Sequence, residues 1–181
     1  MTRPEKNGFD LDAGSAINGA VDTEVASRLI RVVLEGEALT RLSPILEADR
    51  AQAVADLEAE NHFALMGARA QPGPYALHLS IQEGRLVFDV RHADEQPISA
   101  VLLALGPFRS LIKDYQLLVE SYLKAVEEGR EARIQAIDMG RRGLHNEGAE
   151  LMRQRLEGKI AIDFETARRL FTLVCVLHQR I

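Results

Sequence analysis

The chain has 181 residues, of which 46% are apolar and 5% aromatic, and it carries a net charge of −5. This length favours a single domain with an aliphatic core, and the acidic charge argues against a general nucleic-acid binder, which needs a broad basic face. The single cysteine, Cys175, excludes an internal disulfide, and since we find neither a long apolar run nor a signal-peptide pattern, we expect a cytoplasmic protein without membrane contact.

The first elements form a tail, a strand and a helix. Residues 1–26 are rich in Gly, Asn, Asp, Ser and Thr, a composition typical of a flexible tail. The β-branched run over 28–35 predicts a strand with partial cover on both faces. Ser43 and Pro44 suit the N-cap and first position of a helix near 44–60.

The clearest local pattern is a β-hairpin. Apolar and polar residues alternate over 75–82 and 85–91, on either side of Glu83 and Gly84. A two-residue loop at this point fixes the register, in which the paired residues are Leu77 with Val90, Leu79 with Phe88, Ile81 with Leu86, and His78 with Asp89. One face of the hairpin is then consistently apolar.

The rest of the chain is mainly helical, after a further possible strand at 98–103. Apolar residues repeat at helical spacing over 107–128 and again over 131–139, 144–157 and 163–180. The last of these is apolar on nearly every side except at Thr172, which predicts a buried central helix. We therefore expect residues 27–181 to form a single α+β domain, with a small antiparallel sheet packed against four or five helices.

The segment over 138–148, DMGRRGLHNEG, is the best candidate for a site. Gly140 and Gly143 each oppose a helix by about 1 kcal/mol, so a bend or break is expected there. The side chains then have natural roles in binding and proton transfer. Candidate ligand-binding residues are Gly140, Arg141, Arg142, Gly143 and Asn146, and candidate catalytic residues are Asp138, His145 and Glu147.

A purely structural interpretation of this segment carries more weight. In it, the glycines permit close packing at a helix corner and the charges form a local ion-pair network. The glycine spacing does not match nucleotide-binding loops, because the segment follows a helix and lacks the lysine and hydroxyl of a P-loop.

Other candidates are weaker. His78 and Asp89, with Ser80 on the same strand, are better explained as an exposed cross-strand pair than as a catalytic group. The five histidines lack the paired spacing of metal proteins, so we expect neither a metal nor another cofactor. Cys175 is expected to be an inert core thiol, whereas Arg168 and Arg169 could join the 138–148 cluster.

Four stretches of the chain resemble a bacterial family known as uncharacterised protein family 0262: YALHLSIQEGRLVFDVR, LGPFRSLIKDYQLLVESY, MGRRGLHNEG and LEGKIAIDFETARRLFTLVCVLH. The resemblance covers about residues 27–180. It implies a family but no activity, so it assigns no catalytic role.

Two functions follow as hypotheses. The preferred one is a non-enzymatic regulatory or protein-interaction module, because no catalytic constellation is complete. The alternative is a small enzyme or anion-binding protein that acts on a phosphorylated or carboxylated metabolite through 138–148. RNA binding ranks below both, since residues 130–163 contain no aromatic side chain for base stacking.

Overall fold

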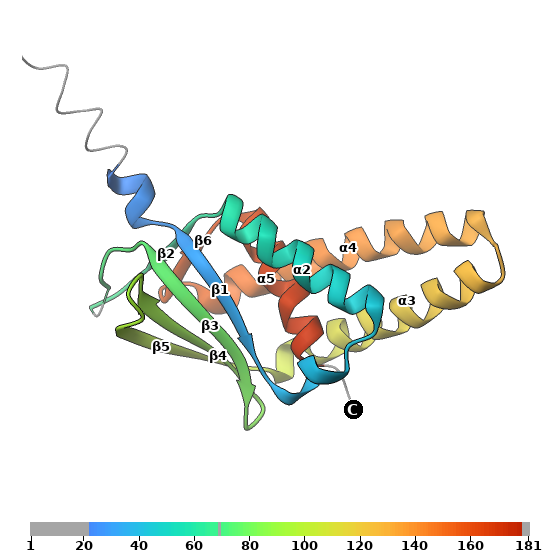
Figure 1. The fold of residues 1–181 in the computed structure, drawn as a ribbon, viewed down its shortest axis with the longest axis horizontal. Helices are drawn as coiled ribbons and strands as arrows, with labels where there is room; N and C mark the ends of the chain where they lie inside the picture. Colours follow the sequence, from blue (N-terminus) through green and yellow to red (C-terminus); the bar gives the residue numbers. More distant parts are fainter. Residues whose placement is uncertain (1–21, 69, 179–181) are drawn as a thin grey trace, which may run out of the picture.

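A computed structural model of the chain describes residues 22–68 and 70–178. The sheet lies at one end of the molecule, and two long helices extend away from it at the other (Figure 1). One hydrophobic core joins both parts, which confirms the predicted α+β class. Most of the expected tail lies outside the described residues, and residues 22–26 are helical.

The main sheet is mixed. Its strands β1 (Leu29–Glu35), β3 (Tyr75–Gln82), β4 (Arg85–His92) and β5 (Pro97–Ala104) lie in the order β1-β3-β4-β5. Neighbours from β3 to β5 are antiparallel, but β1 runs parallel to β3, so the expectation of a wholly antiparallel sheet is wrong at β1. Helix α2 (Pro44–Ala59) is the reason, because it carries the chain back across the sheet before β3 begins.

The hairpin of β3 and β4 has the predicted register. Leu77 pairs with Val90 and Leu79 with Phe88, and all four side chains are fully buried. Glu83 and Gly84 form the turn at φ 50° and 73°, the left-handed conformation that a tight hairpin of this hand requires.

Side chains at the end of α2 hold the outer edge of β1. The Asn61 side chain accepts a hydrogen bond from the Leu29 N–H at 2.8 Å and donates to the carbonyls of Leu29 and Leu57 at 2.8 and 2.6 Å. Glu58 accepts from the Val32 N–H at 3.0 Å. Three backbone groups of this sheet edge are therefore satisfied by side chains at or just beyond the end of α2 instead of by a neighbouring strand.

A second, two-stranded sheet was not predicted. Strands β2 (Phe63–Leu65) and β6 (Ile160–Ile162) pair antiparallel, and each is too short to produce a recognisable alternation. The remaining short elements are the 3₁₀ turns η1 (Glu37–Arg41) and η2 (Gly106–Phe108).

Helix α5 (Phe164–Leu177) is the buried central helix that its sequence predicts. Asp163 caps it by accepting a hydrogen bond from the Thr166 N–H at 2.8 Å. From Leu170 to Leu177 every residue except Thr172 is buried. Helices α2 and α4 (Glu131–Leu156) pack against α5, and α3 (Arg109–Glu127) packs against α4.

Helix α4 corrects the sequence prediction of two helices, near 131–139 and 144–157. It runs unbroken through Gly140 and Gly143. The two glycines cost about 1 kcal/mol each, but burial of an apolar residue contributes roughly 1.5–3 kcal/mol. Ile137, Leu144 and Met152 are all buried along this helix, so packing outweighs the local preference for a break.

Candidate functional site

Because α4 is continuous, it divides the 138–148 segment between two faces. The inner face turns toward the core and consists of Ile137, Arg141, Leu144, His145 and Gly148, all buried or half-buried. The outer face is exposed and consists of Met139, Arg142, Gly143 and Asn146, which lie at the i, i+3, i+4 and i+7 positions of one helical stripe. Asp138 is half-buried between the faces, and Gly140 and Glu147 are exposed.

On the inner face, Arg141 belongs to a polar network that links three helices. Its Nη2 atom donates to Oδ2 of Asp49 on α2 at 2.9 Å, and its Nη1 atom lies 4.0 Å from Asp138. The hydroxyl of Tyr115, on α3, donates to the same Oδ2 atom of Asp49 at 2.7 Å. Burial, followed by this hydrogen bond, raises the pKa of Tyr115 far above its usual value. The phenol therefore remains protonated and holds the helices together.

His145 lies one turn beyond Arg141, between two aromatic rings. Its ring centroid is 5.6 Å from that of Tyr115 and 6.1 Å from that of Phe171. Burial lowers the pKa of His145 to about 4, and the nearby charges of Arg141 and Arg168 add to the shift. The imidazole is thus neutral at physiological pH. Its Nε2 atom is buried and has no hydrogen-bond partner among the described residues.

The outer-face residues do not join this network. Among the described residues, the side chains of Arg142, Asn146 and Glu147 have no hydrogen-bond or ion-pair partner. The structure thus brings Arg141, His145 and Asp138 together on or beside the inner face and separates Arg142, Asn146 and Glu147 from them.

The glycines of the segment differ in what surrounds them. A Cβ atom built at Gly148 would lie 2.4–2.6 Å from the Phe171 ring, so this glycine is required for α4 to pack against α5. A Cβ at Gly140 would make an ordinary contact with Leu118 at 3.6 Å, and one at Gly143 would meet nothing within 4 Å. Close packing within the chain therefore explains Gly148 but neither Gly140 nor Gly143.

The second candidate pair lies on the sheet. His78 and Asp89 are opposite each other in the predicted register, but His78 makes its hydrogen bonds to Glu35 at 2.8 Å and Glu95 at 2.7 Å. Asp89 accepts instead from Arg91 at 2.7 Å. Hydrogen bonding to His78 is the first cause that lowers the pKa of Glu95. This cluster binds β1, β3 and β4 to the β4–β5 turn, the arrangement of a structural ion network.

Sequence reasoning missed Asp49, the acceptor that organises the inner face. Its signal was present, because Asp49 lies at helical spacing from the buried residues Leu46 and Ala53. A carboxylate on the apolar stripe of a helix needs a partner. The sequence suggested that Arg168 could join the 138–148 cluster. Arg168 does approach it, since its charge acts on His145.

Among residues 22–68 and 70–178 no group of three or more potential ligand side chains could hold a metal ion. Within the same residues, no helix is both long and apolar enough to cross a membrane.

Comparison with known proteins identifies relatives along most of the chain. The profile of a family described as "Uncharacterised protein family (UPF0262)" matches residues 26–180. A UPF0262 protein of Granulibacter bethesdensis is 73% identical over 86% of this chain and 92% of its own. Similar proteins occur in Acidiphilium cryptum, 60% identical over 87% and 96%, and in Rhodospirillum rubrum, 48% identical over 84% and 92%. No solved structure shows a significant match.

Proposed function

Since the chain belongs to the uncharacterised family UPF0262, whose name assigns no activity, we propose a function from its own surface: it is a non-enzymatic interaction module that binds a helix of a protein partner on the outer face of α4.

The exposure of Met139 beside two dispensable glycines carries this proposal. Met139 is 73% exposed, the highest value among the exposed large apolar side chains of the described residues. Gly140 and Gly143 each cost the helix about 1 kcal/mol relative to alanine, and the fold leaves room for a Cβ atom at both. Residues that weaken a fold without a packing role are expected at functional sites.

The shape of the outer face suits a helix. Without a side chain at Gly143, a partner backbone can approach α4 closely, and the flexible Met139 side chain can adapt to the apolar surface of that partner. Arg142 and Asn146, which precede and follow Gly143 along this stripe, supply hydrogen-bond donors. An amphipathic helix with a narrow apolar stripe and carboxylates beside it would complement this surface.

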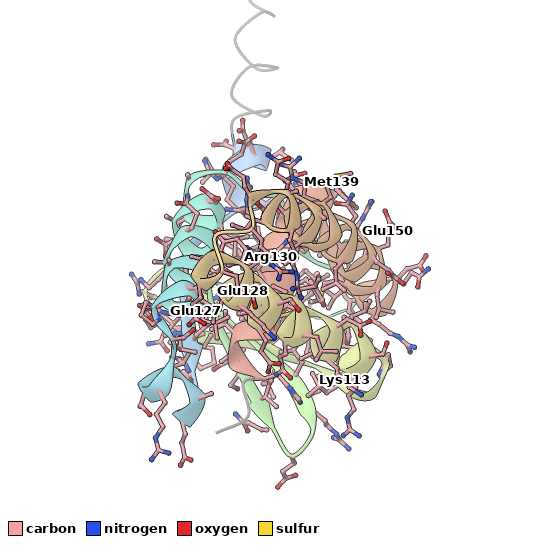
Figure 2. All side chains as sticks on the ribbon, turned by 90° about the vertical axis from the view of Figure 1, so that its right-hand side faces the viewer. Lys113, Glu127, Glu128, Arg130, Met139 and Glu150 are labelled. Atoms are coloured by element: carbon pink, nitrogen blue, oxygen red, sulfur yellow. The ribbon has the colours of Figure 1, made fainter. Side chains whose placement is uncertain are left out.

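The position of α4 supports access by a partner. Helices α3 and α4 form a hairpin that extends beyond α2 and α5 (Figure 1). Figure 2 shows Met139 and Glu150 along the edge of α4 that is turned away from α3, while Glu127, Glu128 and Arg130 lie at the tip of the hairpin. The tip of the hairpin is charged, whereas Met139 exposes an apolar side chain on the side of the hairpin.

The alternative of an enzyme acting through 138–148 has less support. It requires Arg141, Arg142 and His145 to converge on one substrate, but Arg142 lies on the outer face and Arg141 is engaged with Asp49. His145 is neutral and half-buried, and among the described residues no carboxylate is hydrogen-bonded to it that would make it a general base. We place the module in the cytoplasm, where a chain with one cysteine is ordinary.

Photo-crosslinking in the native cell tests this function. A benzophenone amino acid replaces Met139 in the full chain, and the matched control replaces the exposed Arg85 on the sheet. We expect a discrete adduct from position 139 that disappears when Gly143→Arg is added, because that side chain fills the space over α4. Absence of an adduct, or an equal adduct from position 85, would contradict the proposal.

A further inference from the structure

A crevice on the opposite side of α4 has a separate chemistry from the outer face. It lies where α2, α4 and α5 meet and has a volume of about 180 Å³. The residues that line it are Asp56, His145, Glu165, Arg168, Arg169 and Thr172. Sites for drug-sized ligands are typically about 300–1,000 Å³, so this crevice admits only a small ion or molecule.

Two residues of the crevice lining each have a buried side-chain nitrogen without a partner. These nitrogens are Nε of Arg168 and Nε2 of His145, which have no hydrogen-bond partner among the described residues. The Nε atom of arginine can only donate. A buried donor without an acceptor destabilises a protein, and native structures contain few of them. The crevice therefore offers a donor that the fold itself does not satisfy.

The two carboxylates of the crevice do not supply the missing acceptor. Asp56 accepts from Gln52 at 2.8 Å and lies 3.8 Å from Nε of Arg169. Glu165 lies 3.5 Å from Nη1 of Arg168, but its side chain is 56% exposed. Asp56 therefore meets Gln52 and Arg169, and Glu165 meets a different nitrogen of the Arg168 guanidinium, so Nε of Arg168 remains without an acceptor.

His145 adds a second donor without adding charge. Its ring is neutral at physiological pH, so one of its two nitrogens carries a proton. Arg141 lies near the same ring, and its Nε atom is also buried without a partner. The charges of the Arg141 and Arg168 guanidinium groups both act on this ring, which favours negative charge beside it.

We propose that the crevice binds a small oxyanion of the phosphate type, held by Arg168 and His145. A phosphate oxygen accepts from Nε of Arg168 in a charge-assisted hydrogen bond, and a second accepts from the N–H of His145. Such an anion would connect α4 to α5 from the inner side. This site is independent of the partner surface on the outer face, because the two share no residue.

A phosphate titration of the full chain tests the site. Thermal unfolding is followed in increasing inorganic phosphate, with sodium chloride keeping the ionic strength constant. We expect a saturable rise in melting temperature. Arg168→Gln should weaken the apparent affinity by about tenfold or more, the loss of one charge-assisted hydrogen bond. Arg85→Gln, an exposed control on the sheet, should leave it unchanged.

An NMR measurement and a comparison of ligands complete the test of the phosphate site. In the wild-type chain, phosphate should shift the ring nitrogen NMR signals of His145 and leave those of His62 and His92 in place, a test that needs no variant to fold. Phosphoserine is compared with inorganic phosphate, so that equal or tighter binding identifies a phosphorylated side chain as the source. No saturable response, an equal response in Arg168→Gln, or tighter binding of acetate than of phosphate would overturn the proposal.

Discussion

Alanine at Gly143 and alanine at Gly148 should change the stability of the chain in opposite directions, although both sites lie within α4. At Gly143 the new methyl group meets nothing within 4 Å. Its only effect is to remove the entropic penalty of glycine in a helix, so the free energy of unfolding should rise by about 0.5–1 kcal/mol.

At Gly148 the same methyl group would lie 2.4–2.6 Å from the ring of Phe171. That ring is fully buried, so it cannot turn into solvent, and α4 and α5 must separate. Overpacking of this kind costs about 1–3 kcal/mol, which exceeds the gain in helix propensity in most of that range. The helix-propensity gain is common to both sites, so we expect Gly148→Ala to be less stable than Gly143→Ala by roughly 1–3 kcal/mol.

Urea unfolding followed by circular dichroism measures both variants against the wild-type chain. The slope of the transition should not change, so the midpoints report stability directly. For a chain of this size, about 1 kcal/mol corresponds to roughly 2–4 °C in melting temperature. If both alanines stabilise, the close contact with Phe171 is refuted, and if Gly143→Ala destabilises by more than about 1 kcal/mol, α4 is not helical there.

Three further predictions concern the inner face and the sheet edge. The free energy of unfolding should fall by about 3 kcal/mol from pH 6.5 to 4 because of His145, whose pKa is about 4 in the folded chain and 6.5 in the unfolded chain, so that the unfolded chain binds more protons in this window. Urea titrations at several pH values should show that His145→Gln lacks this decrease. If the variant loses as much stability with falling pH as the wild-type chain, the prediction is contradicted. Tyr115→Phe removes the donor to Asp49 and should cost about 1–2 kcal/mol in the same assay, with no loss if the hydrogen bond is absent. Asn61→Ala leaves both backbone groups of Leu29 without their partner and should cost about 2–3 kcal/mol; faster amide exchange at Leu29 is expected, and unchanged exchange would count against this contact.

Features determined by neighbouring residues were predictable from the sequence. The hairpin register follows from a two-residue loop at Glu83 and Gly84, and the buried character of α5 follows from apolar residues on nearly all its sides. The parallel pairing of β1 with β3 was not predictable in this way. It depends on the path that α2 takes across the sheet, which no local pattern specifies.

The sequence did not assign the residues of the 138–148 segment to the correct faces of a helix. Gly140 and Gly143 favoured a break, and the faces of a helix cannot be assigned across a break. Tertiary packing of Leu144 and Gly148 decides that α4 continues, and only then do Arg141 and Arg142 point to different sides. The acceptor for Arg141 is Asp49, far away in sequence on α2, so local spacing could not identify it.

A cysteine-accessibility scan tests the central claim, that the outer face of α4 is free in the isolated chain and covered by a partner in the cell. Cys175 is fully buried, and burial raises its thiol pKa, so the background reaction is slow. Cysteines at positions 139, 142 and 146 should react rapidly in the purified protein and be protected in intact cells, whereas cysteines at 137 and 144 should react slowly in both. Equal labelling of the outer positions in cells and in purified protein would contradict the account.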